Sequence, residues 1–175
     1  MKKTDTRRLV FCALFTALIV LLSQLQLPVG PVPVSLATLG VMLCGLLLGW
    51  RFGALAVGAY ILLGAVGVPV FAGFQGGAGR LIGPTGGYIA GYLFYALLAG
   101  LNIPRLQERF WGRCVLLLLG TAVCYGLGTA WFMRMSGRTL AESLSLCVLP
   151  FLPGDAAKIA LAAFLTPRLR KGMKI

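Results

Sequence analysis

The sequence contains no histidine, and only 11% of its 175 residues are charged, with four acids against sixteen lysines and arginines. Without histidine the chain can form neither a Ser-His-Asp triad nor an HExxH zinc site. Soluble domains carry roughly 25% charged residues, more than twice the share found here. Apolar residues make up 59% of this chain and its mean hydropathy is +0.92, whereas disordered chains are much less apolar. A nucleic-acid-binding protein would gather the net charge of +12 on one face, whereas these charges lie between long uncharged runs. The composition therefore predicts an integral membrane protein of one domain.

The uncharged runs predict six transmembrane helices. A single helix over residues 9–50 would be about 63 Å long, twice the thickness of the hydrocarbon layer, and Pro28, Pro31 and Pro33 would break it. The expected fold class is all-α integral membrane, a single domain over residues 1–175. Its spans are expected near 9–26, 34–50, 52–67, 86–102, 113–133 and 153–169, with a short interfacial or buried helix at 140–150.

The basic residues predict the orientation of these helices. Twelve of the sixteen fall on one side of the predicted arrangement, which by the positive-inside rule places both termini in the cytoplasm (N-in/C-in). The expected location is a bacterial or archaeal cell membrane, crossed several times. A cleaved signal peptide is the alternative for the N-terminal segment, but no small-x-small site follows it and five more spans do.

Asp155 and Lys158 are the acid and the base that fall inside a predicted span. Each costs about 2.5–3.5 kcal/mol at the centre of a membrane helix on insertion scales. Three residues apart, they share a helix face and can pair. Two interpretations follow: a self-neutralising ion pair near the helix end, or a polar-ligand site that faces the bundle interior.

The connection between the third and fourth predicted spans is rich in glycine and also apolar, with eight glycines among residues 73–91. Non-helical backbone at membrane depth persists only where it is buried or lines a cavity, so we expect this outer loop to line a site. Thr85 is the expected N-cap of the following helix, whose first N–H groups, from Gly86 onward, favour an anionic group. No GxxxxGK[ST] sequence is present, so no Walker-type ATP site is expected in this chain.

Small residues recur at helical spacing, which is typical of close helix contacts. The pattern occurs at Ala13 and Ala17, at Gly45, Gly49 and Gly53, and at Gly87 and Gly91. Close packing inside the bundle is the interpretation that the spacing alone favours.

Three segments in order, PVPVSLATLG, VGVPVFAGFQGGAGRLIGPTGGY and FLPGDAAK, carry a family resemblance. Over nearly the whole chain the sequence resembles the biotin-specific substrate-binding (S) component of energy-coupling factor (ECF) transporters, the BioY family. The resemblance implies six membrane helices, high-affinity capture of biotin from outside and its uptake. ATP hydrolysis would come from partners, a transmembrane scaffold subunit and two ABC-type ATPase subunits. It also implies that Ala13 and Ala17 engage the scaffold subunit.

The resemblance further implies a binding site. Three positions depart from the family pattern: Ala37 where glutamine is common, Ser35 in place of threonine, and Ile89 where some relatives have a basic residue. Because of the last departure, Arg80 is a candidate to contact the ligand carboxylate, and Lys158 and the first N–H groups of the helix after Thr85 are the alternatives. The opposite placement of the ligand would use the same residues. Phe71 and Tyr92 would help to cover the apolar middle of biotin. The expected substrate-binding residues are Asp155, Lys158, Gln75, Phe74, Gly73, Arg80, Thr85, Gly86 and Tyr88.

Two other functions compete with this one. The first is an S component, or a small autonomous carrier, for a different vitamin. The second is an intramembrane enzyme with Asp155 and Lys158 as an acid–base pair, which the missing histidine and the lack of a nucleophile–base pair disfavour. No pair of cysteines has metal or redox spacing, so we expect no metal, no cofactor and no catalysis in this chain. Biotin, the ECF subunits and the lipid bilayer are the expected partners; nucleic acid is not, and a homo-oligomer is left open.

Overall fold

The structure is a computed structural model that describes residues 3–27 and 32–173, without the side chains of residues 3–5 and 27. A two-residue antiparallel ribbon joins the first two helices, and all other regular elements are helices. The all-α fold class is thus confirmed, while Pro28 and Pro31 of the predicted first link lie outside the described residues. In chain order the elements are α1 (Lys3–Gln24), β1 (Gln26–Leu27), β2 (Val34–Ser35), α2 (Ala37–Ala65), α3 (Ala78–Ile82), α4 (Gly86–Ala99), α5 (Pro104–Glu108), α6 (Phe110–Ser136), α7 (Leu140–Cys147) and α8 (Leu152–Met173).

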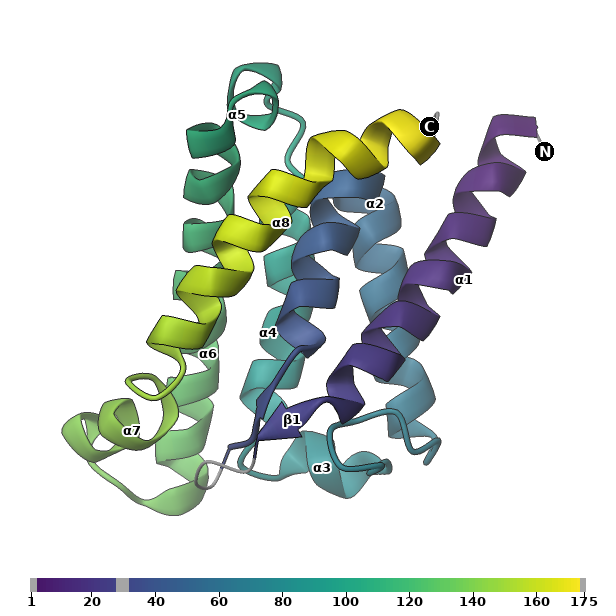
Figure 1. The fold of residues 1–175 in the computed structure, drawn as a ribbon. Coiled ribbons are helices and arrows are strands. Elements are labelled where there is room, and N and C mark those ends of the chain that lie inside the picture. Colours follow the sequence, from purple (N-terminus) through teal and green to yellow (C-terminus); the bar gives the residue numbers. More distant parts are fainter. Residues whose placement is uncertain (1–2, 28–31, 174–175) are drawn as a thin grey trace.

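The long helices form one bundle. α4 packs against α2 and α6, α1 packs against α2, and α8 lies across α2 and α6. Both ends of the chain lie at the same end of the bundle, and α3, β1 and α7 lie at the opposite end (Figure 1). An even number of membrane crossings places both termini at the same end of a bundle. The cytoplasmic assignment of the termini remains a prediction.

α2 is broken at Gly49, which has a φ of 77° and a ψ of 175°, a conformation essentially restricted to glycine. Two contacts replace the helical bonds lost there: the amide of Trp50 donates to the carbonyl of Gly100, and Arg170 donates to the carbonyl of Leu46. The chain reverses at this residue, and the two halves of α2 lie side by side (Figure 1). The halves occupy the predicted spans 34–50 and 52–67, with the turn at Gly49 itself.

Three helices, α1, α2 and α6, are long and apolar enough to cross a membrane, and α7 with α8, bent by 54°, would make a fourth. α4 is apolar but has only 14 residues, fewer than the roughly 20 of a typical crossing. Six spans therefore remain a prediction. The helix expected at 86–102 ends at Ala99, and the one expected at 153–169 extends over 152–173.

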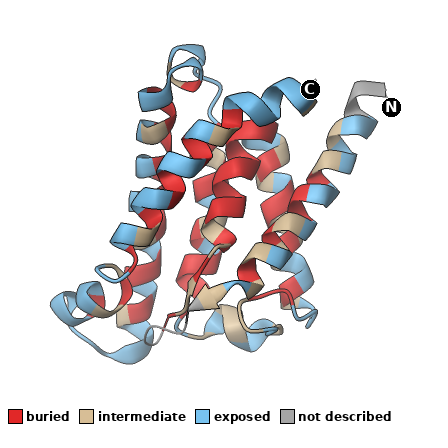
Figure 2. Ribbon diagram, viewed as in Figure 1, coloured by how far each residue is buried: buried red, intermediate tan, exposed pale blue. Residues whose placement is uncertain are grey.

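Buried residues face the centre of the bundle, and the outer faces of α1, α6 and α8 are largely exposed (Figure 2). Large apolar side chains cover these outer faces: Leu14, Leu118 and Phe164 are 58, 56 and 50% exposed. Such a surface is typical of a protein whose surroundings are lipid, because hydrocarbon does not penalise exposed apolar side chains.

The predicted small-residue contacts differ from one another. Gly45 abuts Ala96 and Ala99 of α4, and Gly91 abuts Cys124 of α6, so both glycine patterns serve helix packing. Ala13 and Ala17, in contrast, are exposed on the outer face of α1. Packing inside the bundle is therefore the wrong interpretation for the alanine pair.

Candidate functional site

Asp155 and Lys158 lie in the first turns of α8 and form a buried ion pair. Lys158 Nζ is 2.9 Å from Asp155 Oδ1, and the two residues are 6 and 4% exposed. The helix supplies this geometry, since residues three apart lie on one face. The pair is buried in the bundle and is also the ion pair of the first interpretation, so this geometry does not separate the two interpretations.

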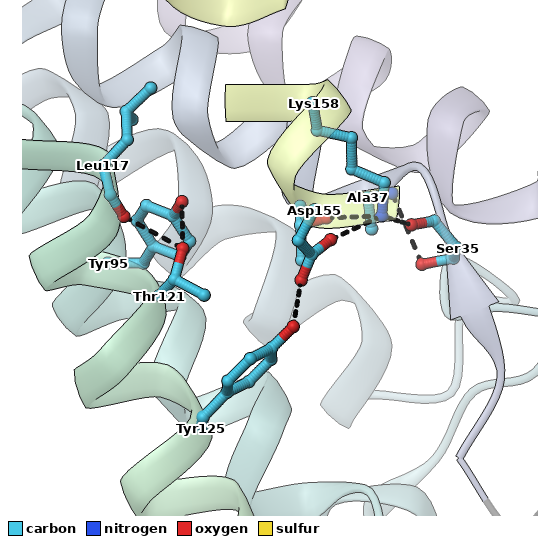
Figure 3. Close-up of polar contacts among 9 residues, drawn as sticks. Ser35, Ala37, Tyr95, Leu117, Thr121, Tyr125, Asp155 and Lys158 are labelled. Carbon is cyan, nitrogen blue, oxygen red and sulfur yellow. Dashed lines mark hydrogen bonds and ion pairs between the residues drawn. The ribbon is translucent and has the colours of Figure 1, made fainter. Parts of the chain in front are cut away.

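Three further residues, each from a different element, complete the polar cluster, and Figure 3 shows two of them, Tyr125 and Ser35, beside the ion pair. Tyr125 of α6 donates its hydroxyl hydrogen to Asp155 Oδ2 at 2.5 Å. Lys158 Nζ donates to the carbonyl of Ser35 at 2.7 Å and to Thr38 Oγ1 at 3.0 Å. An ammonium group has three donors, so Lys158 is fully satisfied, whereas a carboxylate has about four acceptor positions and Asp155 uses two for side-chain partners.

Sequence reasoning assigned no role to Tyr125 or Thr38, and it noted Ser35 only as a departure from the family pattern. The available signal for Tyr125 was that it is the one tyrosine in the predicted span 113–133. A hydroxyl in such a span needs a buried partner.

Two adjoining cavities lie beside this cluster. The first contains about 370 Å³ of unfilled space, including its mouth, and reaches Asp155, Lys158 and Tyr125. The second contains about 460 Å³ on the same basis and reaches Arg80 and Thr85. Both share the walls formed by Val32, Pro33, Ser35, Tyr88 and Tyr92. The carboxylate and the guanidinium thus line two neighbouring cavities with shared walls, which together are called the recess below.

Aromatic side chains line the middle of this recess. Tyr88 and Tyr92 come from α4, Tyr60 from the second half of α2, and Phe71 from the glycine-rich loop. Tyr60 and Phe71 meet edge to face, with ring centroids 5.5 Å apart. Gly64 makes room for the Phe71 ring, which a Cβ at that position would overlap. The recess therefore combines aromatic walls with the polar groups of Asp155, Lys158, Arg80 and Thr85.

The glycine-rich loop is fastened to the end of α1. Ser23 Oγ donates to the carbonyl of Val70 at 2.6 Å, and Gln24 Oε1 accepts from the amide of Phe74 at 2.8 Å. Phe71 and Gln75 form an antiparallel bridge within the loop. These bonds fix the side of the loop that carries Phe71 against the recess.

The structure brings most of the predicted site residues to the recess, but not all of them. Asp155, Lys158, Arg80, Thr85 and Tyr88 line it. Thr85 is the N-cap residue of α4 as expected, although its side chain makes no capping hydrogen bond. The other four predicted residues do not line the recess. Gly73 and the buried Gly86 directly follow the lining residues Ala72 and Thr85 in the sequence, and Phe74 and Gln75 are exposed.

The three departures from the family pattern can also be placed. Ala37 and Ile89 line the recess on the side of Arg80. Ser35 contributes its carbonyl to Lys158, and its hydroxyl accepts from the amide of Ala37 at 3.3 Å. The serine therefore fixes the start of α2 beside the lysine.

Known proteins are similar to this chain over nearly its whole length. The chain is 38% identical over 165 residues to the Biotin transporter BioY of Thermotoga maritima, covering 94% of this chain and 96% of that protein. It is 39% identical over 158 residues to the Probable biotin transporter BioY of Pyrococcus horikoshii, covering 90 and 93%. A crystal structure of the S-component for biotin from an ECF-type ABC transporter matches with a TM-score of 0.91 and 35% identity, covering 98% of this chain and 94% of that one. The model of the BioY family matches residues 1–175, and the chain belongs to this family.

Proposed function

We propose that this chain binds biotin as the S component of an ECF-type transporter and takes part in biotin uptake across the cell membrane. The names of the similar proteins support this, because those proteins match the chain over nearly their full lengths. In this proposal the spans are α1, the two halves of α2, α4, α6 and α8, and both termini are cytoplasmic. A scaffold subunit and two ABC-type ATPase subunits energise the transport, so this chain carries out no chemistry and holds no cofactor.

The unused acceptor positions of buried Asp155 are the observation that carries the proposal. Biotin has a ureido ring with two N–H donors, and a buried carboxylate in an apolar recess is a strong acceptor for such donors. Lys158 has no donor left for a ligand, because its three hydrogens go to Asp155, Ser35 and Thr38. The lysine therefore holds Asp155 in place, and the ureido ring binds at the Asp155 end.

This orientation directs the other end of biotin toward Arg80. A guanidinium is suited to a carboxylate, to which it can donate two parallel hydrogen bonds. The aromatic groups between the two ends would cover the thiophane ring and the valerate chain. Polar ends and an apolar middle thus occur in the recess in the same order as in the ligand.

Titration of the purified, detergent-solubilised protein with biotin tests the proposal. We expect sub-micromolar binding of one biotin per chain, and at least tenfold weaker binding for Asp155→Asn, a loss of about 1.4 kcal/mol or more. Glu108→Gln is the matched control, because it removes an exposed carboxylate far from the recess. Absence of binding to well-folded protein would refute the proposal, and tighter binding of another water-soluble vitamin would favour the alternative S component.

The exposed alanines of α1 support a docking role for that helix. Ala13 and Ala17 lie on its outer face, where small side chains allow a second helix to approach closely. We expect Ala13→Trp to abolish co-purification of the scaffold and ATPase subunits while biotin still binds. Ala122→Trp on the exposed face of α6 is the control, and co-purification that survives Ala13→Trp excludes this surface.

A further inference from the structure

Another cavity, not one of the two that form the recess, opens at the end of the bundle that carries both termini. It contains about 1020 Å³ of unfilled space, including its mouth, and is lined by α1, the turn of α2 and the end of α8. Arg170, one of its lining residues, follows Asp155 by 15 positions on α8, about 22 Å along the helix axis. The cavity is therefore separate from the recess proposed for biotin.

Three arginines from three helices line this cavity: Arg8 of α1, Arg51 of α2 and Arg170 of α8. No acidic residue of the described chain lines it. One helix segment, the second half of α2, begins at this cavity, whereas the first half of α2, α4 and α8 end at it, so the positive charge of the cavity comes from the arginines and not from helix dipoles. The cavity is thus complementary to an anion.

Among the described residues, the contacts that hold these guanidinium groups are aromatic rings and uncharged acceptors. Arg8 lies over the Phe52 ring, 5.4 Å from its centroid, and Arg51 lies over the Trp50 ring at 4.8 Å. Arg170 donates to the carbonyl of Leu46 and to Gln107 Oε1, each at 2.8 Å, through one of its three nitrogens. Each arginine therefore keeps hydrogen-bond donors for a ligand.

The rest of the lining is apolar, which distinguishes the kind of anion. Leu47, Leu48, Phe52 and Met173 contribute to the walls, and Trp50 at the mouth is 44% exposed. A small inorganic anion would gain nothing from these walls, whereas a lipid has hydrocarbon beside its phosphate. Basic recesses between membrane helices are also a recurrent place for anionic headgroups.

We infer that this cavity binds the phosphate group of an anionic phospholipid from the leaflet that faces the two termini. The arginines contact the phosphate, and the acyl chains follow the exposed apolar face that begins at Leu9 and Val10 of α1. The lipid would join α1, α2 and α8 at the end where the turn of α2 is held by single hydrogen bonds to Gly100 and Arg170.

Native mass spectrometry of the detergent-solubilised chain, titrated with phosphatidylglycerol or with phosphatidylcholine, tests this inference. We expect phosphatidylglycerol to bind at least fivefold more tightly, and the double variant R8Q/R51Q to lose that preference. Arg170 is left intact because the carbonyl of Leu46 depends on it. The control is R105Q/R109Q, which removes the same charge from α5 (Figure 1) and its C-cap, two residues that do not line the cavity.

Equal losses in the two double variants would overturn the inference, because general surface charge would then explain the preference. Equal binding of the two lipids would also overturn it. Inorganic phosphate that displaces phosphatidylglycerol at equal concentration would assign the cavity to a soluble anion instead of a lipid. If R8Q/R51Q does not fold, the lipid preferences of the single variants R51Q and R105Q are compared instead, with the same two outcomes.

Discussion

Arg113 is a buried arginine whose guanidinium fills a gap that Pro167 leaves in α8. Proline has no backbone N–H, so the carbonyl of Ala163 lacks the donor that a helix normally supplies. Arg113 Nε donates to this carbonyl at 2.9 Å, and Nη1 donates to the carbonyls of Gln107 and Glu108. Arg113 is 6% exposed and Ala163 is fully buried, so water does not replace this bond.

We expect Arg113→Met to lower the free energy of unfolding by about 1–3 kcal/mol, because it leaves a buried carbonyl without a donor. Methionine keeps much of the side-chain volume, and removal of a buried guanidinium returns part of its desolvation penalty. Pro167→Ala restores a backbone N–H for the carbonyl of Ala163. In that background the same arginine substitution should cost at least about 1 kcal/mol less.

Reversible unfolding in mixed micelles, followed by circular dichroism, gives the four free energies of this double-mutant cycle. Arg105→Met is the control, since Arg105 is exposed, and we expect a change within about 0.5 kcal/mol. If the effects of Arg113→Met and Pro167→Ala add to within about 0.5 kcal/mol, the reasoning is refuted. The arginine would then stabilise α6 and α8 by packing alone.

Two further substitutions test the recess and the turn of α2. Tyr125→Phe removes the hydroxyl that donates to Asp155. We expect about three- to tenfold weaker biotin binding, measured by isothermal titration. A hydrogen bond to a charged group contributes about 1.5–3 kcal/mol, and water replaces part of this contribution. Tyr95→Phe, which removes a buried hydroxyl bonded to Thr121 and outside the recess, should leave binding unchanged, and equal losses would contradict the assignment. Gly49→Ala should destabilise the protein by about 1–3 kcal/mol in the same micelle assay, because φ is 77° and ψ is 175° there. Gly58→Ala, at a helical position with open space around it, should not destabilise the protein, and a similar loss at both glycines would exclude backbone strain as the cause.

The central pair of the site could be predicted because its geometry is local. Asp155 and Lys158 are three residues apart, and any helix through them places both on one face. Their other partners could not be predicted in the same way. Tyr125, Ser35 and Thr38 come from 30 to 123 positions away, and only tertiary packing determines which polar side chain meets the pair.

The basic residues illustrate the same limit. In the sequence, Arg113 and Arg170 served only to predict which ends of the helices face the cytoplasm, because each lies near the end of an apolar run. In the structure both donate to carbonyls that a helix break or a proline leaves without a partner. The turn of α2 was predicted to within two residues from the charge at Arg51, but the residue that makes it, Gly49, looks in the sequence like one more packing glycine.

The pairing of Asp155 with Lys158 also has a consequence for membrane voltage. One elementary charge moved across a potential of 100 mV changes the free energy by about 2.3 kcal/mol. Because the carboxylate and the ammonium lie 2.9 Å apart on one helix, they move together and sum to zero. A tilt or displacement of this pair through the electric field therefore adds almost no dependence on voltage, whereas a lone lysine at this position would add that of one full charge.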